Sequence, residues 1–340
     1  MRSPPAFLLA TIGLLLTQTA ASAMERLSLP QPFSMAYYES WEEMPVALGS
    51  ATRLAMTPGH IDVQVLGFAR PDLVYQGGLD LTETGLQAPV SGRVLADAVK
   101  ALKTRAPGMK VLLAVGGSGY VDGWHRYNPK ALAHLVTDLG LDGVDLDYEP
   151  AKPDCQTAQA RKGPTVVCRT DLIWSKLIAD TRTVLPRPMM LSIPGWSTGA
   201  YGTGDFQTEP PGGPYTGSML WLGRDREAAA AVDLVAIMAY AAGPAYDPER
   251  AFTAYRAIWD GPLALGLIVP PDPTGQPVPG IDAIRDLAAR LGSQEQAGVM
   301  VYGMLGTPPS GPNAAMPSGG MMLRAVCEGF GRDGCDAPLP

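Results

Sequence analysis

The sequence is poor in histidine and in basic clusters, and each shortage argues against a class of function. Its three histidines are His60, His125 and His134, and their spacing is not that of zinc ligands. No feature implies a metal or an organic cofactor, and we expect none. Lysine and arginine number 26 against 33 acidic residues, for a net charge of −7, and they form no basic run. This balance argues against nucleic acid or an anionic membrane surface as a partner.

Long apolar runs are also missing, except near the N-terminus. Arg2 is followed by an apolar run over 6–16 and by Ala21-Ser22-Ala23. The run is too short to span a bilayer, and the order of charge, apolar run and small residues is typical of a secretory signal peptide. A buried N-terminal helix is the alternative. We expect residues 1–23 to be removed on export, leaving residues 24–340 as one soluble domain, secreted or periplasmic and free of the membrane.

Cysteine is scarce too, and its positions suggest a structural use. The four cysteines form two close pairs, Cys155/Cys168 and Cys327/Cys335. In an oxidising compartment, pairing within each close pair is the simplest of the three possible connectivities. Four unpaired thiols are the alternative, and neither pair resembles a catalytic site. We expect two disulfides that restrict the unfolded chain.

What the sequence does contain is a regular alternation of apolar runs and amphipathic segments. Near-continuous apolar runs, bounded by Gly or Pro, are typical of parallel strands covered on both faces. Capping signals predict helices between most of them, with weaker signals in the first and fifth connections. The expected strands are 33–38, 61–69, 110–117, 141–149, 189–194, 232–240, 263–270 and 298–305. The expected helices include 91–105, 128–140, 247–261 and 282–292.

Eight strands alternating with helices over about 300 residues predict an α/β fold, a single-domain (β/α)8 TIM barrel. An open doubly wound sheet is the alternative. That fold predicts a glycine-rich phosphate loop after the first strand, and none follows Tyr38. In a barrel, the residues that carry the chemistry lie at the carboxyl ends of the strands.

The fourth run, DGVDLDYE over 142–149, carries three carboxyl groups at alternate positions. Side chains alternate between faces along a strand, so Asp145, Asp147 and Glu149 are expected to point into the barrel. Desolvation and mutual repulsion oppose ionisation there, so we expect at least one proton to be retained. A solvated edge strand and a calcium loop fit less well, because the interleaved residues are apolar and the glycine of a calcium loop is missing. The pattern favours a functional site.

With these residues the sequence resembles glycoside hydrolase family 18, the chitinase-like barrels, over nearly the whole mature chain. DGVDLDYE is similar to the DxxDxDxE signature of that family. Three further motifs, on the third, sixth and last strands, follow in the right order, and the four together are far more specific than any one. MAYYESW (35–41) also resembles the first strand of the family. The three motifs are KVLLAVGG (110–117), with Ala114 where Ser is usual, IMAY (237–240) and GVMVY (298–302).

The resemblance implies a secreted glycosidase that cleaves β-1,4-linked N-acetylglucosamine glycans, such as chitin, by substrate-assisted retaining catalysis. Glu149 would be the general acid and base. Asp147 would hold the acetamido N–H of the substrate, and Asp145 would share a proton with Asp147. Tyr240 would donate to the acetamido oxygen. Tyr302, at a common Trp position, would form the floor under the reacting sugar.

Two departures from the family pattern bear on the substrate. Ala241 follows Tyr240, where many relatives carry Asp or Asn, and this bears on rate and on substrate identity. The span 271–297 is too short for the α+β insertion of processive chitinases. We therefore expect a shallow, open cleft and endo-acting cleavage.

Further candidates for substrate contact lie in the motifs or on the expected upper loops. Each aromatic residue among them has packing within a loop as an alternative. Trp174 and Trp259 are expected in helices, as core residues. The candidates are Tyr38, Trp41, Trp124, Trp196 and Met238, with Tyr120, Tyr215 and Trp221 as weaker ones.

Three rival functions remain to be compared. Gly195-Trp196-Ser197-Thr198-Gly199 matches the nucleophile elbow of serine hydrolases, but that fold needs a histidine after the serine, and the last histidine is His134. A non-catalytic chitinase-like glycan-binding protein is a second alternative, which Ala241 keeps open and the presence of Glu149 opposes. An endo-β-N-acetylglucosaminidase acting on N-glycans or peptidoglycan is the third.

Overall fold

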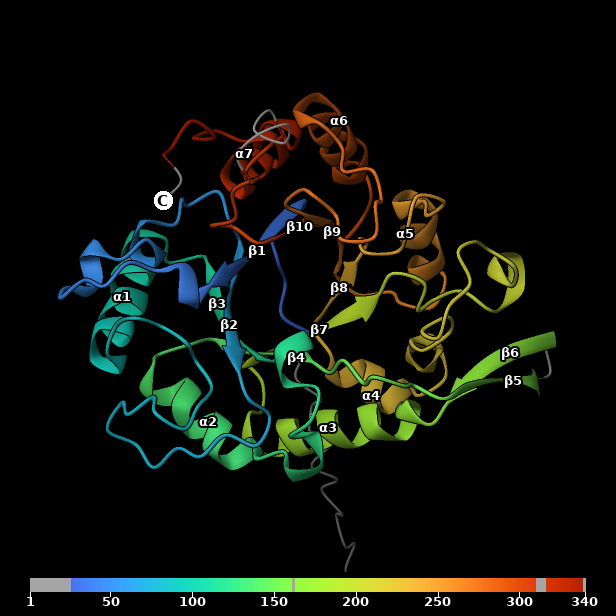
Figure 1. Cartoon of the computed structure of the whole chain (residues 1–340), viewed down its shortest axis with the longest axis horizontal. Coiled ribbons are helices and arrows are strands. Elements are labelled where there is room, and N and C mark those ends of the chain that lie inside the picture. The colour runs from blue at the N-terminus through green and yellow to red at the C-terminus, as the bar shows by residue number, and fades with distance from the viewer. Residues whose placement is uncertain (1–25, 161–162, 310–315, 339–340) are drawn as a thin grey trace, which may run out of the picture.

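The computed structural model describes residues 26–160, 163–309 and 316–338. Eight parallel strands close into a barrel, and helices surround it (Figure 1). The expected (β/α)8 architecture is confirmed. The expected signal peptide, residues 1–23, lies outside the described residues and stays a prediction. In order around the barrel the strands are β1 (Phe33–Glu39), β2 (Val63–Ala69), β3 (Lys110–Gly116), β4 (Gly143–Asp147), β7 (Met190–Trp196), β8 (Leu234–Met238), β9 (Leu263–Ile268) and β10 (Ala297–Tyr302).

The strand side chains divide into two apolar layers, as alternation along a strand requires. In β1, Met35 and Tyr37 belong to the cluster inside the barrel, whereas Tyr38 belongs to the layer between the barrel and the helices. In β4, Val144 and Leu146 face the helices. The acidic residues between them therefore point into the barrel, as expected.

The helices form the outer layer and begin largely where the capping residues predict. The side chains of Ser91, Asn128 and Asp247 each accept a hydrogen bond from a backbone N–H in the first turn of the helix that follows. The helices are α1 (Gly92–Arg105), α2 (Pro129–Asp138), α3 (Thr170–Val184), α4 (Arg226–Ala231), α5 (Pro248–Arg256), α6 (Ile281–Gly292) and α7 (Gly319–Gly329). Among the described residues, no helix has both the length and the hydrophobicity needed to cross a membrane.

The connections between strands agree with the sequence except at two places. Short 3-10 turns alone join β1 to β2, the short α4 follows β7, and a single helix, α6, lies between β9 and β10. The expected absence of an inserted α+β domain is thus confirmed. However, α5 is shorter than expected and ends at Arg256, because Trp259 leaves the helix and donates its indole N–H to the carbonyl of Pro262. A hairpin of β5 (Cys155–Ala160) and β6 (Gly163–Cys168), which the sequence did not predict, projects beside α3 (Figure 1).

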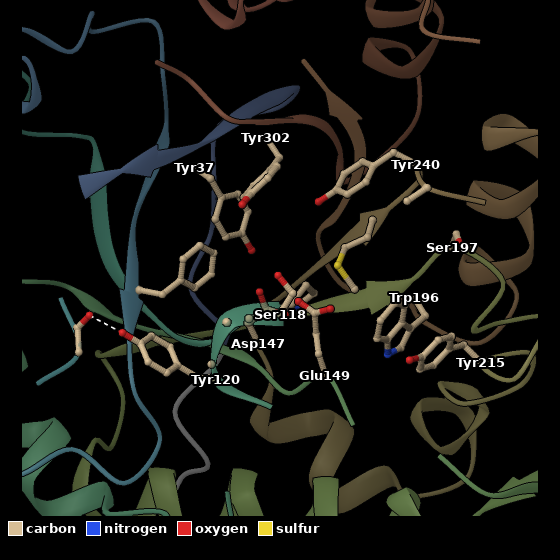
Figure 2. Close-up of a pocket in the computed structure, with 18 of the residues that line it drawn as sticks. Tyr37, Ser118, Tyr120, Asp147, Glu149, Trp196, Ser197, Tyr215, Tyr240 and Tyr302 are labelled. Atoms are coloured by element: carbon tan, nitrogen blue, oxygen red, sulfur yellow. Dashed lines mark hydrogen bonds between the residues drawn. The ribbon is translucent and has the colours of Figure 1, made fainter. Parts of the chain in front are cut away.

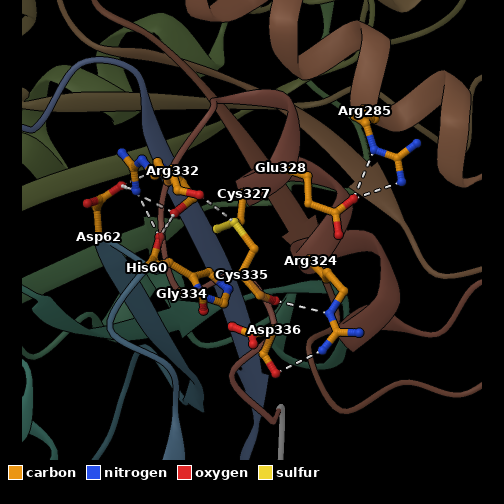
Figure 3. The surroundings of a disulfide bond; sticks show 11 residues. His60, Asp62, Arg285, Arg324, Cys327, Glu328, Arg332, Gly334, Cys335 and Asp336 are labelled. Carbon is orange, nitrogen blue, oxygen red and sulfur yellow. Dashed lines mark hydrogen bonds and ion pairs between the residues drawn. A yellow bond between two sulfur atoms is a disulfide. The ribbon is translucent and has the colours of Figure 1, made fainter.

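Both expected disulfides are present, Cys155–Cys168 across the base of the hairpin and Cys327–Cys335 after α7. The second closes a loop that contacts the amino-terminal end of the barrel (Figure 3). Arg332 in this loop donates to the carbonyl of His60 at 2.8 Å and pairs with Asp62 at 2.7 Å. Its guanidinium also contacts the carbonyl of Pro32. The C-terminal disulfide therefore fixes the starts of β1 and β2.

We predict that replacing both Cys327 and Cys335 by serine lowers the free energy of unfolding by about 2.5 kcal/mol, the chain-entropy value for a loop of this length. Chemical denaturation at constant pH measures the change. The matched control is Ser293→Ala on an exposed turn, which should leave the free energy nearly unchanged. An unfolding free energy of the double variant equal to that of the wild type would contradict a stabilising role for this disulfide.

Candidate active site

The row of acidic residues that begins in β4 leads to a cleft at the carboxyl end of the barrel, where Asp147 and Glu149 lie (Figure 2). Asp145 and Asp147 lie within β4 and are buried, and Glu149 follows the strand and is partly exposed. Asp147 and Glu149 line the cleft, which encloses about 510 Å³. Asp145 lies deeper, below the cleft. The alternation of β4 thus places the carboxyl groups in a row from the barrel interior to solvent.

Asp145 is held by two hydroxyl groups from neighbouring strands. Tyr37 of β1 donates to its Oδ2 at 2.8 Å, and Ser192 of β7 donates to its Oδ1. Burial raises the pKa of Asp145 to about 6, although both hydrogen bonds oppose the rise because they favour the charged form. Both carboxylate oxygens of Asp145 therefore already accept a hydrogen bond.

Asp147 is buried and lies next to two other acidic groups. Burial, followed by the negative charges of Glu149 and Asp145, raises its pKa well above the usual range. Its Oδ1 is buried and has no hydrogen-bond partner among the described residues. Gly116 of β3 allows the backbone of β4 to come this close, since a Cβ there would lie 2.2 Å from the carbonyl oxygen of Asp147. Asp147 thus presents an unsatisfied polar atom next to the cleft.

Glu149 is the carboxyl group that reaches the open part of the cleft. Burial raises its pKa to about 7, against a hydrogen bond from the backbone N–H of Ser118 that lowers it. A carboxyl group with a pKa near 7 retains a substantial protonated fraction at neutral pH and can act as a general acid there. The expectation of a retained proton in this row agrees with the raised pKa of all three acids.

Aromatic rings form the walls of the cleft around these carboxyl groups. Tyr37, Tyr240 and Tyr302 stand together, with ring centroids 5.7 Å apart for Tyr37 and Tyr302 and 6.1 Å apart for Tyr240 and Tyr302. Trp41 stacks on Phe68 at 6.2 Å. These rings come from the ends of β1, β2, β8 and β10, so strands distant in sequence build one apolar, concave surface.

Most of the expected contact residues line this cleft, but three do not. Trp41, Trp196, Met238, Tyr240 and Tyr302 are all in its wall, as are Tyr120 and Tyr215. The expectation for Tyr38 is wrong, because the side chain faces the helix layer and its hydroxyl bonds Glu43. The expectation for Trp124 is also wrong.

Trp124 is 8% exposed and packs against Tyr127 and Tyr148 behind the barrel wall. The weaker candidate Trp221 is likewise buried and stacks on Trp174, outside the cleft. These indoles contribute to the core of the outer layer instead.

The residues of the cleft wall that the sequence did not single out include Tyr37, Phe68 and Ser118. Alternation along the strand could have identified Tyr37, because Tyr37 lies two residues after Met35 and both side chains point into the barrel. Phe68 lies within a run that the sequence correctly assigns to a strand. Ser118 contributes through its backbone, which no side-chain pattern reveals.

The loop that follows Tyr240 carries Ala241 in the wall of the cleft with a left-handed backbone, φ +53°. Asp272, from the loop after β9, accepts a hydrogen bond from the Ala241 N–H at 2.6 Å. Gln276 from the same loop accepts from the Ala242 N–H and donates to the Ala239 carbonyl. A short methyl side chain is thus fixed in the wall of the cleft directly after Tyr240.

No group of three or more His, Cys, Asp or Glu side chains suited to a metal ion occurs within the described part of the chain. The residues that meet at the cleft are carboxylic acids, phenols and indoles. Their chemistry is that of proton transfer and of contact with a ligand that has both apolar faces and polar edges.

Comparison with solved structures places the fold among family 18 barrels. A family GH18 chitinase from Cycas revoluta, solved with (GlcNAc)3, has a TM-score of 0.58 at 11% identity, covering 88% of this chain and 99% of its own. A fungal endo-β-N-acetylglucosaminidase of glycosyl hydrolase family 18 has a TM-score of 0.53 at 15% identity, covering 87% and 97%. A chitinase from Rhizomucor miehei has a TM-score of 0.52 at 18% identity, covering 87% and 99%.

The resemblance to family 18 is confirmed by these neighbours, and what they share with this chain is the fold. Neither a family model nor a curated protein matches the sequence.

The buried acids predict a dependence of stability on pH. Folded Glu149 keeps its proton up to about pH 7, whereas the ordinary pKa is 4.5. The folded state therefore binds more protons between these values, and the free energy of unfolding falls as pH rises through this window. We predict that Glu149→Gln raises the free energy of unfolding relative to the wild type, and that this increase is about 3 kcal/mol larger at pH 8 than at pH 4.

Urea unfolding at both pH values measures this difference. Glu227→Gln, on an exposed position of α4, is the matched control and should show no such dependence. An equal effect of Glu149→Gln at the two pH values would contradict a raised pKa.

Proposed function

We propose that the protein is a secreted glycoside hydrolase that cleaves β-1,4-linked N-acetylglucosamine glycans within the chain. The observation that carries this proposal is the row of buried acids that ends in Glu149, a carboxyl group with a pKa of about 7 at the edge of an aromatic cleft. The likeness of the fold to glycosidases of family 18 supports it.

In the proposed reaction the substrate supplies its own nucleophile. The acetamido carbonyl oxygen attacks the anomeric carbon and forms a cyclic oxazolinium ion, while the bond from that carbon to the glycosidic oxygen breaks. Glu149 gives its proton to the departing oxygen. Water then attacks the anomeric carbon, the ring opens, and the Glu149 carboxylate takes a proton from that water. The acid is thereby restored, and the anomeric configuration is retained.

The residues around Glu149 position the acetamido group. The unpartnered Oδ1 of Asp147 is suited to accept the acetamido N–H, which would hold the carbonyl against the anomeric carbon. Tyr240 points its hydroxyl toward the same part of the cleft (Figure 2) and would donate to the acetamido oxygen. Asp145 would share the remaining proton of the row with Asp147. Tyr302 would form the floor beneath the reacting sugar.

Two features support export and endo-action. The N-terminal segment 1–23 has the order of a signal peptide, and two disulfides fit an oxidising compartment. No domain is inserted between β9 and β10 to deepen the cleft, which favours binding anywhere along a polymer.

We predict that Glu149→Gln reduces the hydrolysis of N-acetylchitohexaose by at least about 10²-fold, the contribution typical of a general acid and base. The amide has nearly the same shape, so the variant should still bind the oligomer. Product chromatography and calorimetry measure the two effects, with Glu227→Gln as the active control. If the wild type binds the oligomer and never cleaves it, the protein is a glycan-binding protein instead, the alternative that Ala241 keeps open.

We also predict that replacing the N-acetyl group by a free amine on the reacting sugar alone abolishes cleavage, because the nucleophile is then missing. The test compares defined chitooligosaccharides deacetylated at this sugar or at a distant one, with products identified by mass spectrometry. The distant change should have little effect. Normal cleavage of the first substrate would contradict the substrate-assisted mechanism.

A second candidate substrate is the chitobiose core of N-glycans, favoured by the likeness of the fold to the fungal endo-β-N-acetylglucosaminidase. Digestion of a panel of chitin oligomers, N-glycoproteins and peptidoglycan, read by mass spectrometry, separates these substrates. We expect the chitin oligomers to be cleaved fastest.

A further inference from the structure

The segment Gly195-Trp196-Ser197-Thr198-Gly199 has no role in the reaction proposed above. It begins within β7 and turns away at the carboxyl end of the barrel. The backbone N–H of Gly199 donates to the carbonyl of Trp196 at 2.8 Å, so the segment is a tight turn. Trp196 and Ser197 line the cleft. A conformation this tight in the wall of the cleft calls for an explanation.

Buried Tyr255 of α5 holds this turn from behind. Its hydroxyl donates to the carbonyl of Trp196 at 2.5 Å. The same hydroxyl fills the space beside both glycines, because a Cβ would lie 2.6 Å from it at Gly195 and 2.5 Å from it at Gly199. A neighbouring residue, Tyr246, donates to the carbonyl of Ser197 at 3.1 Å. Two phenol hydroxyls and two glycines therefore fix the backbone that carries Trp196.

A second segment supports the indole itself. Tyr215 stacks on Trp196 with ring centroids 3.6 Å apart and an interplanar angle of 13°. The chain around Tyr215 is tied to the turn, since the N–H of Met219 donates to the carbonyl of Gly199 and that of Gly217 to the carbonyl of Thr198. The two rings, which we call the Trp196–Tyr215 pair, lie face to face, so Tyr215 covers one face of the indole and holds the indole in the wall of the cleft.

The position of this pair relative to Glu149 indicates which part of a ligand it meets. Glu149 lies between the Trp196–Tyr215 pair on one side and Asp147 with Tyr37 and Tyr302 on the other (Figure 2). Glu149, Trp196 and Tyr215 all line the same cleft. A general acid protonates the oxygen on the leaving-group side of the scissile bond. The sugar attached through that oxygen therefore lies toward the pair.

We propose that the Trp196–Tyr215 pair is the binding platform for the sugar on the leaving-group side, and that Tyr255 is the positioning residue that orients it. The proposal rests on the proposed function. Its ligand is a pyranose whose C–H groups pack on the aromatic surface. Fixing the rings before binding spares the substrate the cost of ordering them. The proposal also explains why a turn that resembles a nucleophile elbow needs both glycines here.

Two substrates that differ on the leaving-group side test this assignment. N-acetylchitotetraose places sugars on both sides of Glu149, whereas β-chitobiosyl fluoride carries only fluoride on the leaving-group side. For Trp196→Ala we expect kcat/KM to fall roughly tenfold or more on the tetraose, a loss typical of one aromatic contact, and to change less than about threefold on the fluoride.

Tyr255→Phe removes the hydroxyl alone and should lower kcat/KM on the tetraose by about threefold to tenfold, chiefly through KM, with the fluoride again little affected. The matched control is Tyr127→Phe, which removes a hydroxyl that is hydrogen-bonded to Thr181 outside the cleft. This variant should leave kcat/KM unchanged on both substrates. Trp196→Phe keeps an aromatic platform and should recover most of the loss of Trp196→Ala.

Equal losses on both substrates, or no loss on the tetraose, would overturn the platform. A Tyr255→Phe variant that behaves like Tyr127→Phe would overturn the positioning role. A wild-type protein that cleaves neither substrate would instead contradict the proposed function, and this assignment with it.

Discussion

The structure depends on the cost of placing carboxyl groups inside a barrel. Asp145 and Asp147 occupy interior positions of β4 that a purely structural barrel would fill with Val or Ile. Burial disfavours their charge, and each added charge disfavours the next. The consequence is a row in which protons are retained at unusually high pH, and its outermost member, Glu149, meets the cleft. The buried row of acids lowers the stability of the fold and keeps a proton available at the cleft.

The surrounding barrel compensates for this cost selectively. The deepest acid, Asp145, is satisfied by hydroxyl groups from β1 and β7. The Oδ1 of Asp147 has no hydrogen-bond partner among the described residues. Glu149 accepts one hydrogen bond, from the backbone N–H of Ser118. Hydrogen-bond support is thus strongest at the deepest acid, Asp145, and weakest at the Oδ1 of Asp147. A ligand that brings an amide N–H to Asp147 would supply the missing hydrogen bond, which links the electrostatics of the site to the chemistry proposed for it.

Much of the fold and the centre of the site could be predicted from the sequence, because both depend on local patterns. Apolar runs located all eight strands, and the alternation of DGVDLDYE placed the acids correctly. The expectation for Tyr38 is wrong because Tyr37 and Tyr38 are adjacent aromatic residues, and only the alternation of the strand decides which of them faces the barrel interior. The hairpin over 155–168 and the contact of Tyr255 with Trp196 could not be predicted, since each depends on packing between segments that no local pattern encodes.

The central claim is that this row of acids holds a proton near neutral pH. Carboxyl-carbon NMR of protein labelled at Asp and Glu measures it directly, with Glu149→Gln used to assign the signal. The account predicts that the Glu149 resonance titrates near pH 7. A resonance that titrates near 4.5, together with two aspartates fully ionised at pH 6, would contradict it.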